Sequence, residues 1–190
     1  MRWLTLYARS RQVPASLAAV VITTVTVWAL ARDGSGGPGD PRTPALVLAA
    51  GAMAFSTGLS GQDLALDRTA AIRWAPRRAV HVLLAGAVVA VVLLAVQATG
   101  KDLATAEFIV RDSAGLIGLA AGAAVCGGQY AWTLPFAWLS FSFLAPPPTS
   151  VPTQVASWMM LPPGTAAGTW TALVLTFAGT TAYAVAGPRR

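Results

Sequence analysis

The sequence predicts an all-α, polytopic membrane protein with about six transmembrane helices and an N-terminal interfacial helix. Hydrophobic residues make up 55% of its 190 residues and charged residues 11%, whereas soluble domains carry roughly 25% charged residues. No charged residue or histidine occurs from Ser113 to Pro188. The arginines flank apolar runs and do not form one patch. This composition excludes a disordered chain and a typical soluble enzyme, and despite a net charge of +6 it argues against a nucleic-acid partner.

Residues 1–12 are predicted to form the interfacial helix. Trp3, Leu6 and Tyr7 share one face at helical spacing. Tryptophan and tyrosine favour the level of the lipid headgroups, and the arginines of the same segment can reach lipid phosphates. The alternative is a positively charged flank with no further role.

The apolar runs predict the spans. A helix rises about 1.5 Å per residue, so roughly 20 apolar residues cross the hydrocarbon core. We expect the spans at 13–31, 44–61, 79–100, 113–129, 130–145 and 168–186. The fifth is short and contains Pro135, which a membrane helix tolerates where neighbours satisfy the freed carbonyl. The first run ends like a signal-peptide cleavage site, but it is long enough to span, and we expect it to remain.

The distribution of arginine predicts the orientation. With six spans, the positive-inside rule places both termini in the cytoplasm. That side then carries Arg2, Arg9, Arg11, Arg68, Arg73, Arg77, Arg78, Arg189 and Arg190, and the smaller set Arg32, Arg42, Lys101 and Arg111 lies outside. The preference for arginine over lysine and the absence of asparagine are typical of a GC-rich bacterial genome. We therefore expect a multi-pass protein of the bacterial cytoplasmic membrane.

Residues 62–78 form the sizeable polar segment on the expected cytoplasmic side. The segment is longer than a tight connection requires and has an apolar side. It therefore predicts a short surface helix, ended by the proline, that docks a partner protein. Its candidate docking residues are Asp67, Arg68, Arg73, Trp74, Pro76, Arg77 and Arg78. The alternative is an ordinary positively charged loop.

Residues 146–167, on the expected outer side, combine six prolines with an uncharged apolar piece. Water is not the obvious surrounding for such a segment. We expect it to re-enter the membrane where protein shields its backbone, and to form an outer gate. The gate residues would be Val155, Trp158, Met159, Met160 and Leu161. The alternative is a proline-rich loop resting on the headgroups.

Glycines in the fourth span predict a close helix contact. Gly118 and Gly122 form a G-x-x-x-G pair, with Gly115 one turn earlier, and small residues let helix backbones approach. The contact lies either within the chain or between subunits, and the sequence leaves both open. The glycine-rich loop 33–42 formally matches a dinucleotide fingerprint, but no strand precedes it, so we interpret it as a flexible linker.

The sequence provides no catalytic, cofactor-binding or metal-binding set. A phosphate-binding loop around Lys101 fails, because Ala95 and Asp102 stand at required positions. One histidine, His81, and one cysteine, Cys126, cannot build a histidine- or cysteine-rich metal site. We expect His81 at the interface and Cys126 buried as a small apolar residue. The predicted span interiors hold no charged residue, which argues against a proton- or sodium-driven carrier.

The layout resembles the transmembrane subunit of bacterial ABC exporters of the second permease class, which export drugs, polysaccharides and antibiotics. In that family an amphipathic N-terminal helix precedes six spans, a segment after the second span couples to the ATPase, and short re-entrant helices precede the sixth. Residues 2–11, 62–78 and 146–168 fill those places here. The run AIRWAPRRAVH is similar to the coupling end of the family.

The resemblance implies a permease subunit that is not itself an enzyme. It would work as a homodimer or with a related permease subunit, and a cytoplasmic ATP-binding partner would supply ATP and Mg²⁺ chemistry. An interior without fixed charge predicts an amphipathic or lipid-like substrate. The competing hypothesis is a non-transporting accessory or immunity-type membrane subunit, held to a partner through the glycine face of the fourth span. An intramembrane enzyme is the weakest class, because no acid, base or metal set is present.

Overall fold

The computed structural model describes residues 13–33, 40–59, 74–99 and 102–189, and regular structure in these ranges is helical throughout. The expected interfacial helix at 1–12 lies outside the described residues, as do Asp67, Arg68 and Arg73. The elements are α2 (Val13–Asp33), α3 (Arg42–Leu59), α5 (Trp74–Gln97), α6 (Ala106–Gly127), η1 (Gly128–Tyr130), α7 (Thr133–Leu144), α8 (Val151–Ala156), η2 (Trp158–Met160) and α9 (Ala166–Ala186).

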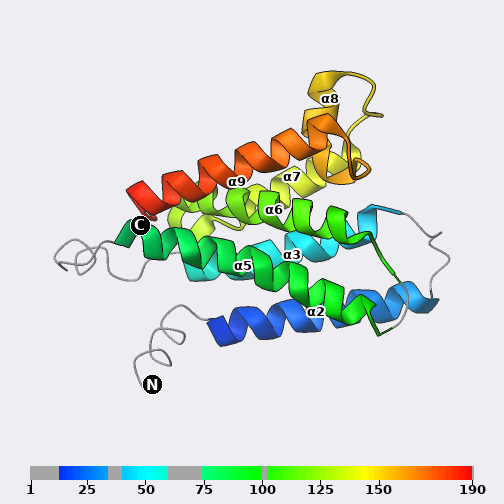
Figure 1. Ribbon diagram of the computed structural model, residues 1–190, viewed down its shortest axis with the longest axis horizontal. Helices are drawn as coiled ribbons and strands as arrows, with labels where there is room; N and C mark the ends of the chain where they lie inside the picture. The colour runs from blue at the N-terminus through cyan, green and yellow to red at the C-terminus, as the bar shows by residue number, and fades with distance from the viewer. Residues whose placement is uncertain (1–12, 34–39, 60–73, 100–101, 190) are drawn as a thin grey trace.

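The long helices lie side by side along the long axis of the molecule and alternate in direction from α2 through α3, α5, α6 and α7 to α9 (Figure 1). One end of the bundle, called here the α8 end, holds α8 and the starts of α3, α6 and α9. The opposite C-terminal end holds the starts of α2 and α5 and the last residues of α9. Chain segments that are far apart in the sequence therefore meet at each end.

Within the described residues, three helices are long and apolar enough to cross a membrane: α5, the continuous stretch Ala106–Tyr130, and α9. Apolar helices at Pro14–Thr26 and Thr133–Leu144 are shorter. The all-helical class and a membrane association are therefore supported. The count of six spans stays a prediction.

Two helix boundaries differ from the predicted spans. Helix α5 begins at Trp74, because a proline in the first turn, here Pro76, removes an N–H that has no partner inside the helix. Helix α6 begins at Ala106, where the Thr105 side chain accepts a hydrogen bond from the Phe108 N–H at 3.3 Å. Glu107 adds a favourable negative charge to the first turn of α6.

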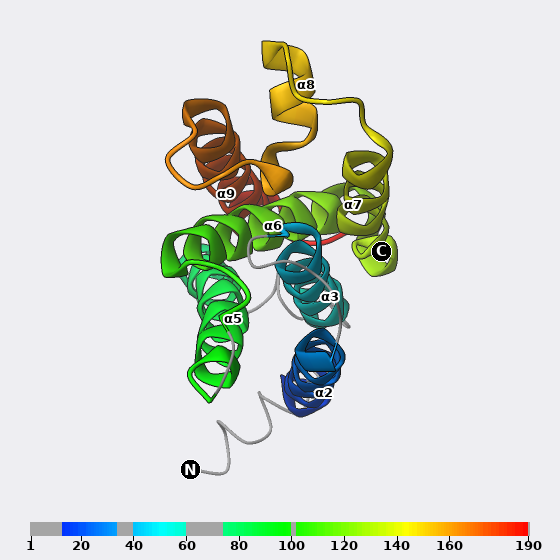
Figure 2. The same ribbon diagram turned by 90° about the vertical axis from the view of Figure 1, so that its right-hand side faces the viewer.

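Helix α6 is the centre of the bundle. Of its apolar stretch 78% is buried inside the protein, against 33% for α5 and 22% for α9. Figure 2 shows α6 between α8 and α9 on one side and α2, α3 and α5 on the other, with α7 beside one end of α6. The large apolar surfaces of α5 and α9 that remain exposed suit contact with lipid or with another subunit.

The predicted glycine contact lies within the chain, between α6 and α9. A Cβ on Gly118 would stand 2.5 Å from backbone atoms of Leu175 and Thr176, and a Cβ on Gly179 would collide with the Gly118 carbonyl. A Cβ on Gly122 would have the Gly179 Cα as its nearest neighbour, at 3.6 Å. Close backbone contact at Gly118 and Gly179 thus fixes the α6–α9 crossing.

Candidate functional site

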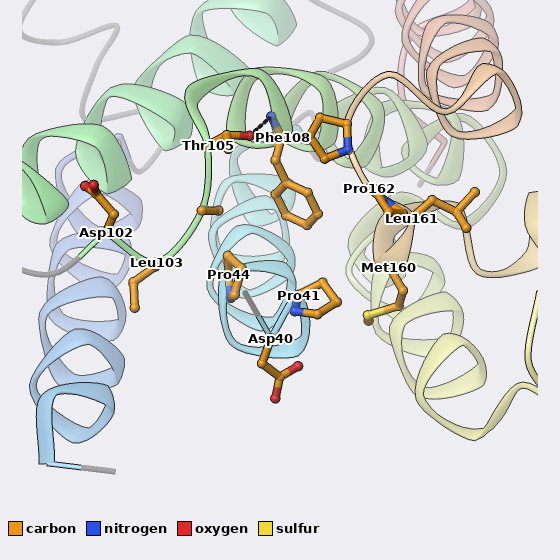
Figure 3. A pocket seen from close by; sticks show the side chains of 12 residues that line it. Asp40, Pro41, Pro44, Asp102, Leu103, Thr105, Phe108, Met160, Leu161 and Pro162 are labelled. Atoms are coloured by element: carbon orange, nitrogen blue, oxygen red, sulfur yellow. Dashed lines mark hydrogen bonds between the residues drawn. The ribbon is translucent and has the colours of Figure 1, made fainter. Parts of the chain in front are cut away.

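A pocket of about 420 Å³ opens at the α8 end of the bundle. Three chain segments that enter helices line it: the start of α3, the approach to α6, and the connection from η2 to α9 (Figure 3). Its lining residues are Asp40, Pro41, Pro44, 102–105, Phe108 and 160–163. Most of these side chains are apolar, and both the size and the chemistry are those of small-molecule sites.

The charged residues of the pocket lining are two aspartates, Asp40 and Asp102, and both are exposed. Their carboxylates lie at the edge of the pocket and point away from Phe108 (Figure 3). One oxygen of Asp40 accepts a hydrogen bond from the Arg42 backbone N–H at 3.0 Å, which caps the start of α3. The pocket therefore has an apolar interior and an exposed carboxylate at each of two separate parts of its edge.

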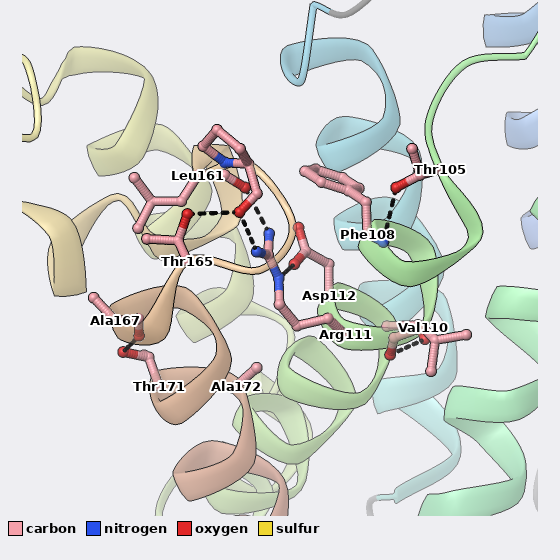
Figure 4. A network of polar contacts seen from close by, with 12 residues as sticks. Thr105, Phe108, Val110, Arg111, Asp112, Leu161, Thr165, Ala167, Thr171 and Ala172 are labelled. Atoms are coloured by element: carbon pink, nitrogen blue, oxygen red, sulfur yellow. Dashed lines mark hydrogen bonds and ion pairs between the residues drawn. The ribbon is translucent and has the colours of Figure 1, made fainter.

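A buried ion pair supports one wall of the pocket from behind. The Arg111 guanidinium donates to the carbonyls of Leu161 at 2.9 Å and Pro162 at 3.1 Å, and its Nε donates to Asp112 at 2.7 Å (Figure 4). Both side chains are nearly inaccessible, with 7% of Arg111 and 0% of Asp112 exposed. The carbonyls belong to an irregular segment. The Leu161 carbonyl has Arg111 as its donor, whereas the Pro162 carbonyl also accepts from the Thr165 hydroxyl at 2.7 Å.

The position of this pair corrects two expectations. The sequence places Arg111 in an outside loop and predicts span interiors without charge, but both Arg111 and Asp112 lie in the second turn of α6, inside a candidate span. The second carboxylate oxygen of Asp112 is buried and has no hydrogen-bond partner within the described part of the chain. A buried carboxylate that is not fully hydrogen-bonded lowers the stability of the fold. The ion pair with Arg111 offsets that cost.

The predicted gate residues lie between the pocket and the core. Trp158 and Met159 are fully buried and Leu161 is nearly so, whereas Met160 is half-buried and Val155 is exposed. Met160 and Leu161 line the pocket. The Trp158 ring packs on α6 at Gly115, where a Cβ would come within 2.5 Å of it. A gating role for this group stays a prediction.

Hydrogen bonds hold the segment that carries the gate residues. Ser150 and Thr153 form a capping box at the start of α8. From α7, the Trp138 indole N–H and the Ser142 hydroxyl both donate to the Ala156 carbonyl, at 2.8 Å and 3.1 Å. We name residues 150–161, comprising α8 and η2, the cap. It is packed against α3, α7 and α9, and its Trp158 ring lies against α6 at Gly115.

The described part of the predicted docking segment is continuous with α5 and does not form a separate helix before it. Trp74, Pro76, Arg77 and Arg78 occupy the first turns of α5 at the C-terminal end. The Arg77 guanidinium carbon lies 5.8 Å from the centre of the Trp74 ring, within the range of a cation–π contact. Arg77 is exposed, and Arg78 is half-buried against Gly187, just after α9.

Two hydrogen bonds to backbone carbonyls hold the C-terminal end together. The Tyr183 hydroxyl of α9 donates to the Leu59 carbonyl at the end of α3, at 2.7 Å. The Arg189 N–H donates to the Ala124 carbonyl in the last turn of α6, at 3.1 Å. These bonds tie the end of α9 and the residues after it to α3 and α6, and Arg78 of α5 packs beside Gly187 in the same place.

Helix α5 links this surface to the pocket. It begins at Trp74 and ends at Gln97, and it is 24 residues long, which corresponds to about 36 Å. At its far end the Gln97 side-chain NH₂ donates to the Ala104 carbonyl at 3.0 Å, and Ala104 lines the pocket. A single helix and one hydrogen bond therefore connect the first turns of α5 with the pocket lining.

Sequence reasoning missed the pocket and the Arg111 bonds that support it. Thr105, directly before the apolar run of α6, is a residue that favours the N-cap. Starting the helix there would have placed Arg111 and Asp112 inside it. Cys126 is exposed, not buried, because an apolar neighbourhood in a membrane sequence does not distinguish a lipid-facing position from the core.

Among the described residues, no group of three or more histidine, cysteine, aspartate or glutamate side chains is placed to hold a metal ion. Comparisons of the chain with family models, with curated proteins and with solved structures found no match. The function of the chain is therefore inferred from its own geometry.

Proposed function

We propose that the chain is the membrane-spanning permease subunit of an ATP-driven exporter and relies on a separate ATPase subunit. The observation that carries the proposal is the continuity of α5 from the basic first turns at one end to the pocket at the other. A transporter driven by a partner needs such a mechanical connection, because the partner acts at one membrane face and the substrate path opens at the other.

The first turns of α5 are the proposed ATPase contact. Arg77 and Arg78 offer positive charge beside the aromatic surface of Trp74, and these residue types are enriched in protein interfaces. The contact would also use Asp67, Arg68 and Arg73, which lie before α5 in the sequence. In the proposed orientation this end faces the bacterial cytoplasm together with both termini.

Two permease subunits, identical or related, would enclose the substrate path. The apolar surfaces left exposed on α5 and α9, including Leu84, Val91 and Phe177, are available to the bilayer and to the second subunit. ATP-driven closure of the ATPase pair would tilt α5. The tilt would be transmitted through Gln97 to the pocket and the cap.

The test is capture of the ATPase from native membranes by the tagged chain. The expected partner contains its own phosphate-binding loop, and the isolated complex hydrolyses ATP. Arg77→Glu together with Arg78→Glu should abolish capture, and Arg77→Glu alone, at an exposed position, should reduce it strongly. Arg42→Glu makes the same charge change at the α8 end and should leave capture intact. Equal capture by all variants would contradict the docking surface.

The alternative of a non-transporting accessory or immunity-type subunit requires the glycine face of α6 to hold its partner. Helix α9 of the same chain occupies that face at Gly115, Gly118 and Gly122. The surface on which this alternative depends is thus buried within the chain, and the permease proposal has the better support.

A further inference from the structure

We propose that the pocket at the α8 end binds an amphipathic cation, with the apolar part of the ligand inside and its positive group at the margin formed by Asp40 and Asp102. The inference rests on the proposed function in one respect: in an exporter, this ligand would be the class of substrate that is exported. Binding itself is a property of this chain and needs no partner.

The interior of the pocket selects an apolar group. Phe108, Leu161 and Pro162 form its sides, and its volume of about 420 Å³ lies in the range of roughly 300–1,000 Å³ that is usual for ligand sites. The Leu161 and Pro162 carbonyls are already engaged by Arg111. They are therefore weak acceptors for a polar group of the ligand. The favourable free energy of binding comes from removing apolar surface from water.

The margin of the pocket selects positive charge. Helices α3 and α6 both begin here, and the positive ends of their dipoles, each equivalent to about half a charge, would favour an anion. Both starts, however, are already capped: the Arg42 N–H donates to Asp40, and the Phe108 N–H donates to Thr105. The two aspartates are the ionisable residues of the lining. The pocket edge therefore suits a cation better than an anion.

The buried ion pair explains why such a pocket persists. Without Arg111, the Leu161 carbonyl would lose its donor and the Pro162 carbonyl would keep only its bonds to Thr165, so the wall that they form would move. Arg111 and Asp112 are not in the pocket lining. Their role is to position the wall, while contact with the ligand belongs to the apolar side chains and the marginal aspartates.

The experiment measures binding of three probes with one apolar body: 4-phenylbutylammonium, 4-phenylbutanol and 4-phenylbutanoate. Calorimetric titrations use the chain alone in lipid nanodiscs at neutral pH, and the signal of empty nanodiscs is subtracted. We expect the ammonium probe to bind about tenfold more tightly than the carboxylate, with the alcohol between them. Equal affinities, tightest binding of the carboxylate, or no binding would overturn the proposal.

Variants assign the signal to the pocket. Asp40→Asn with Asp102→Asn should weaken the ammonium probe about fivefold, as expected for two exposed charge contacts, and leave the alcohol unchanged. Glu107→Gln removes the same charge at an exposed position nearby, outside the lining, and should change the ammonium affinity less than twofold. If the Asp40/Asp102 variant binds the ammonium probe like the original chain, the proposed role of the margin is wrong.

A filling substitution tests the interior independently of charge. Ala104→Phe adds a ring inside the pocket and should remove binding of both the ammonium probe and the alcohol. Ala137→Phe, an exposed position on α7, is the matched control and should bind both probes normally. Normal binding by Ala104→Phe would contradict the site. Each result is obtained without the ATPase, so failure of this proposal is distinguishable from failure of the docking proposal.

Discussion

The two ends of the bundle are built from the same helices but are held together differently. At the α8 end, side chains reach irregular backbone: Arg111 to residues 161 and 162, and Trp138 and Ser142 to Ala156. At the C-terminal end, the ends of the long helices meet directly, with Tyr183 bonded to Leu59. The α8 end contains the buried Arg111–Asp112 pair, whereas Arg77 at the C-terminal end is exposed. The difference indicates that the α8 end is shaped to hold a cavity and the C-terminal end to present a surface.

The largest effect should follow from removing Arg111. Arg111→Leu leaves the buried Asp112 carboxylate without its partner and the Leu161 carbonyl without its donor, so we expect a loss of about 3–5 kcal/mol in the free energy of unfolding. Unfolding in mixed detergent micelles measures it. The double variant Arg111→Leu/Asp112→Leu removes both charges and should recover part of the loss. A double variant less stable than Arg111→Leu would show that the uncompensated charge is not the main cost.

The α6–α9 crossing lies between the two ends and should be next in sensitivity. Gly118→Ala places a methyl group 2.5 Å from the backbone of α9, so we expect a loss of about 1–3 kcal/mol as the helices separate. Gly122→Ala is the matched control, because its Cβ would meet α9 at an ordinary 3.6 Å. Equal stability of the two alanine variants would mean that the crossing adapts and does not fix the bundle.

The stability of the C-terminal end should depend on individual hydrogen bonds between uncharged groups. Tyr183→Phe removes the hydrogen bond to the Leu59 carbonyl and keeps the ring, which is buried. We expect a loss of about 1 kcal/mol in the free energy of unfolding and unchanged binding of the phenylbutyl probes. If Tyr183→Phe weakened binding of the phenylbutyl probes more than twofold, the two ends would not be independent.

The sequence predicts the helical class and the packing role of Gly118 because hydropathy and residue size act locally. It does not reveal the pocket, because the pocket is formed by three segments around residues 40, 104 and 161 that are adjacent only after folding. The sequence places Arg111 in a loop for a related reason: a charge beside an apolar run is normally a flank, and only its bonds to Leu161 and Pro162 identify it as buried. The sequence pattern alone therefore indicates where the cap segment lies in the chain but not which residues it contacts.

The smallest effect tests the connection between the two ends. Gln97→Leu keeps the apolar packing at the end of α5 but removes the hydrogen bond to the Ala104 carbonyl, so stability should fall by at most about 1 kcal/mol. Binding of 4-phenylbutylammonium to the chain alone should change less than twofold, because the pocket lining is intact. In the complex with the ATPase, however, ATP should no longer alter the affinity for the probe, whereas it should do so in the original complex. Thr99→Val, which removes a hydroxyl bonded only to the Val96 carbonyl one turn back, should retain the ATP effect. If ATP still altered the affinity for the probe in Gln97→Leu, the two ends would be coupled by another route.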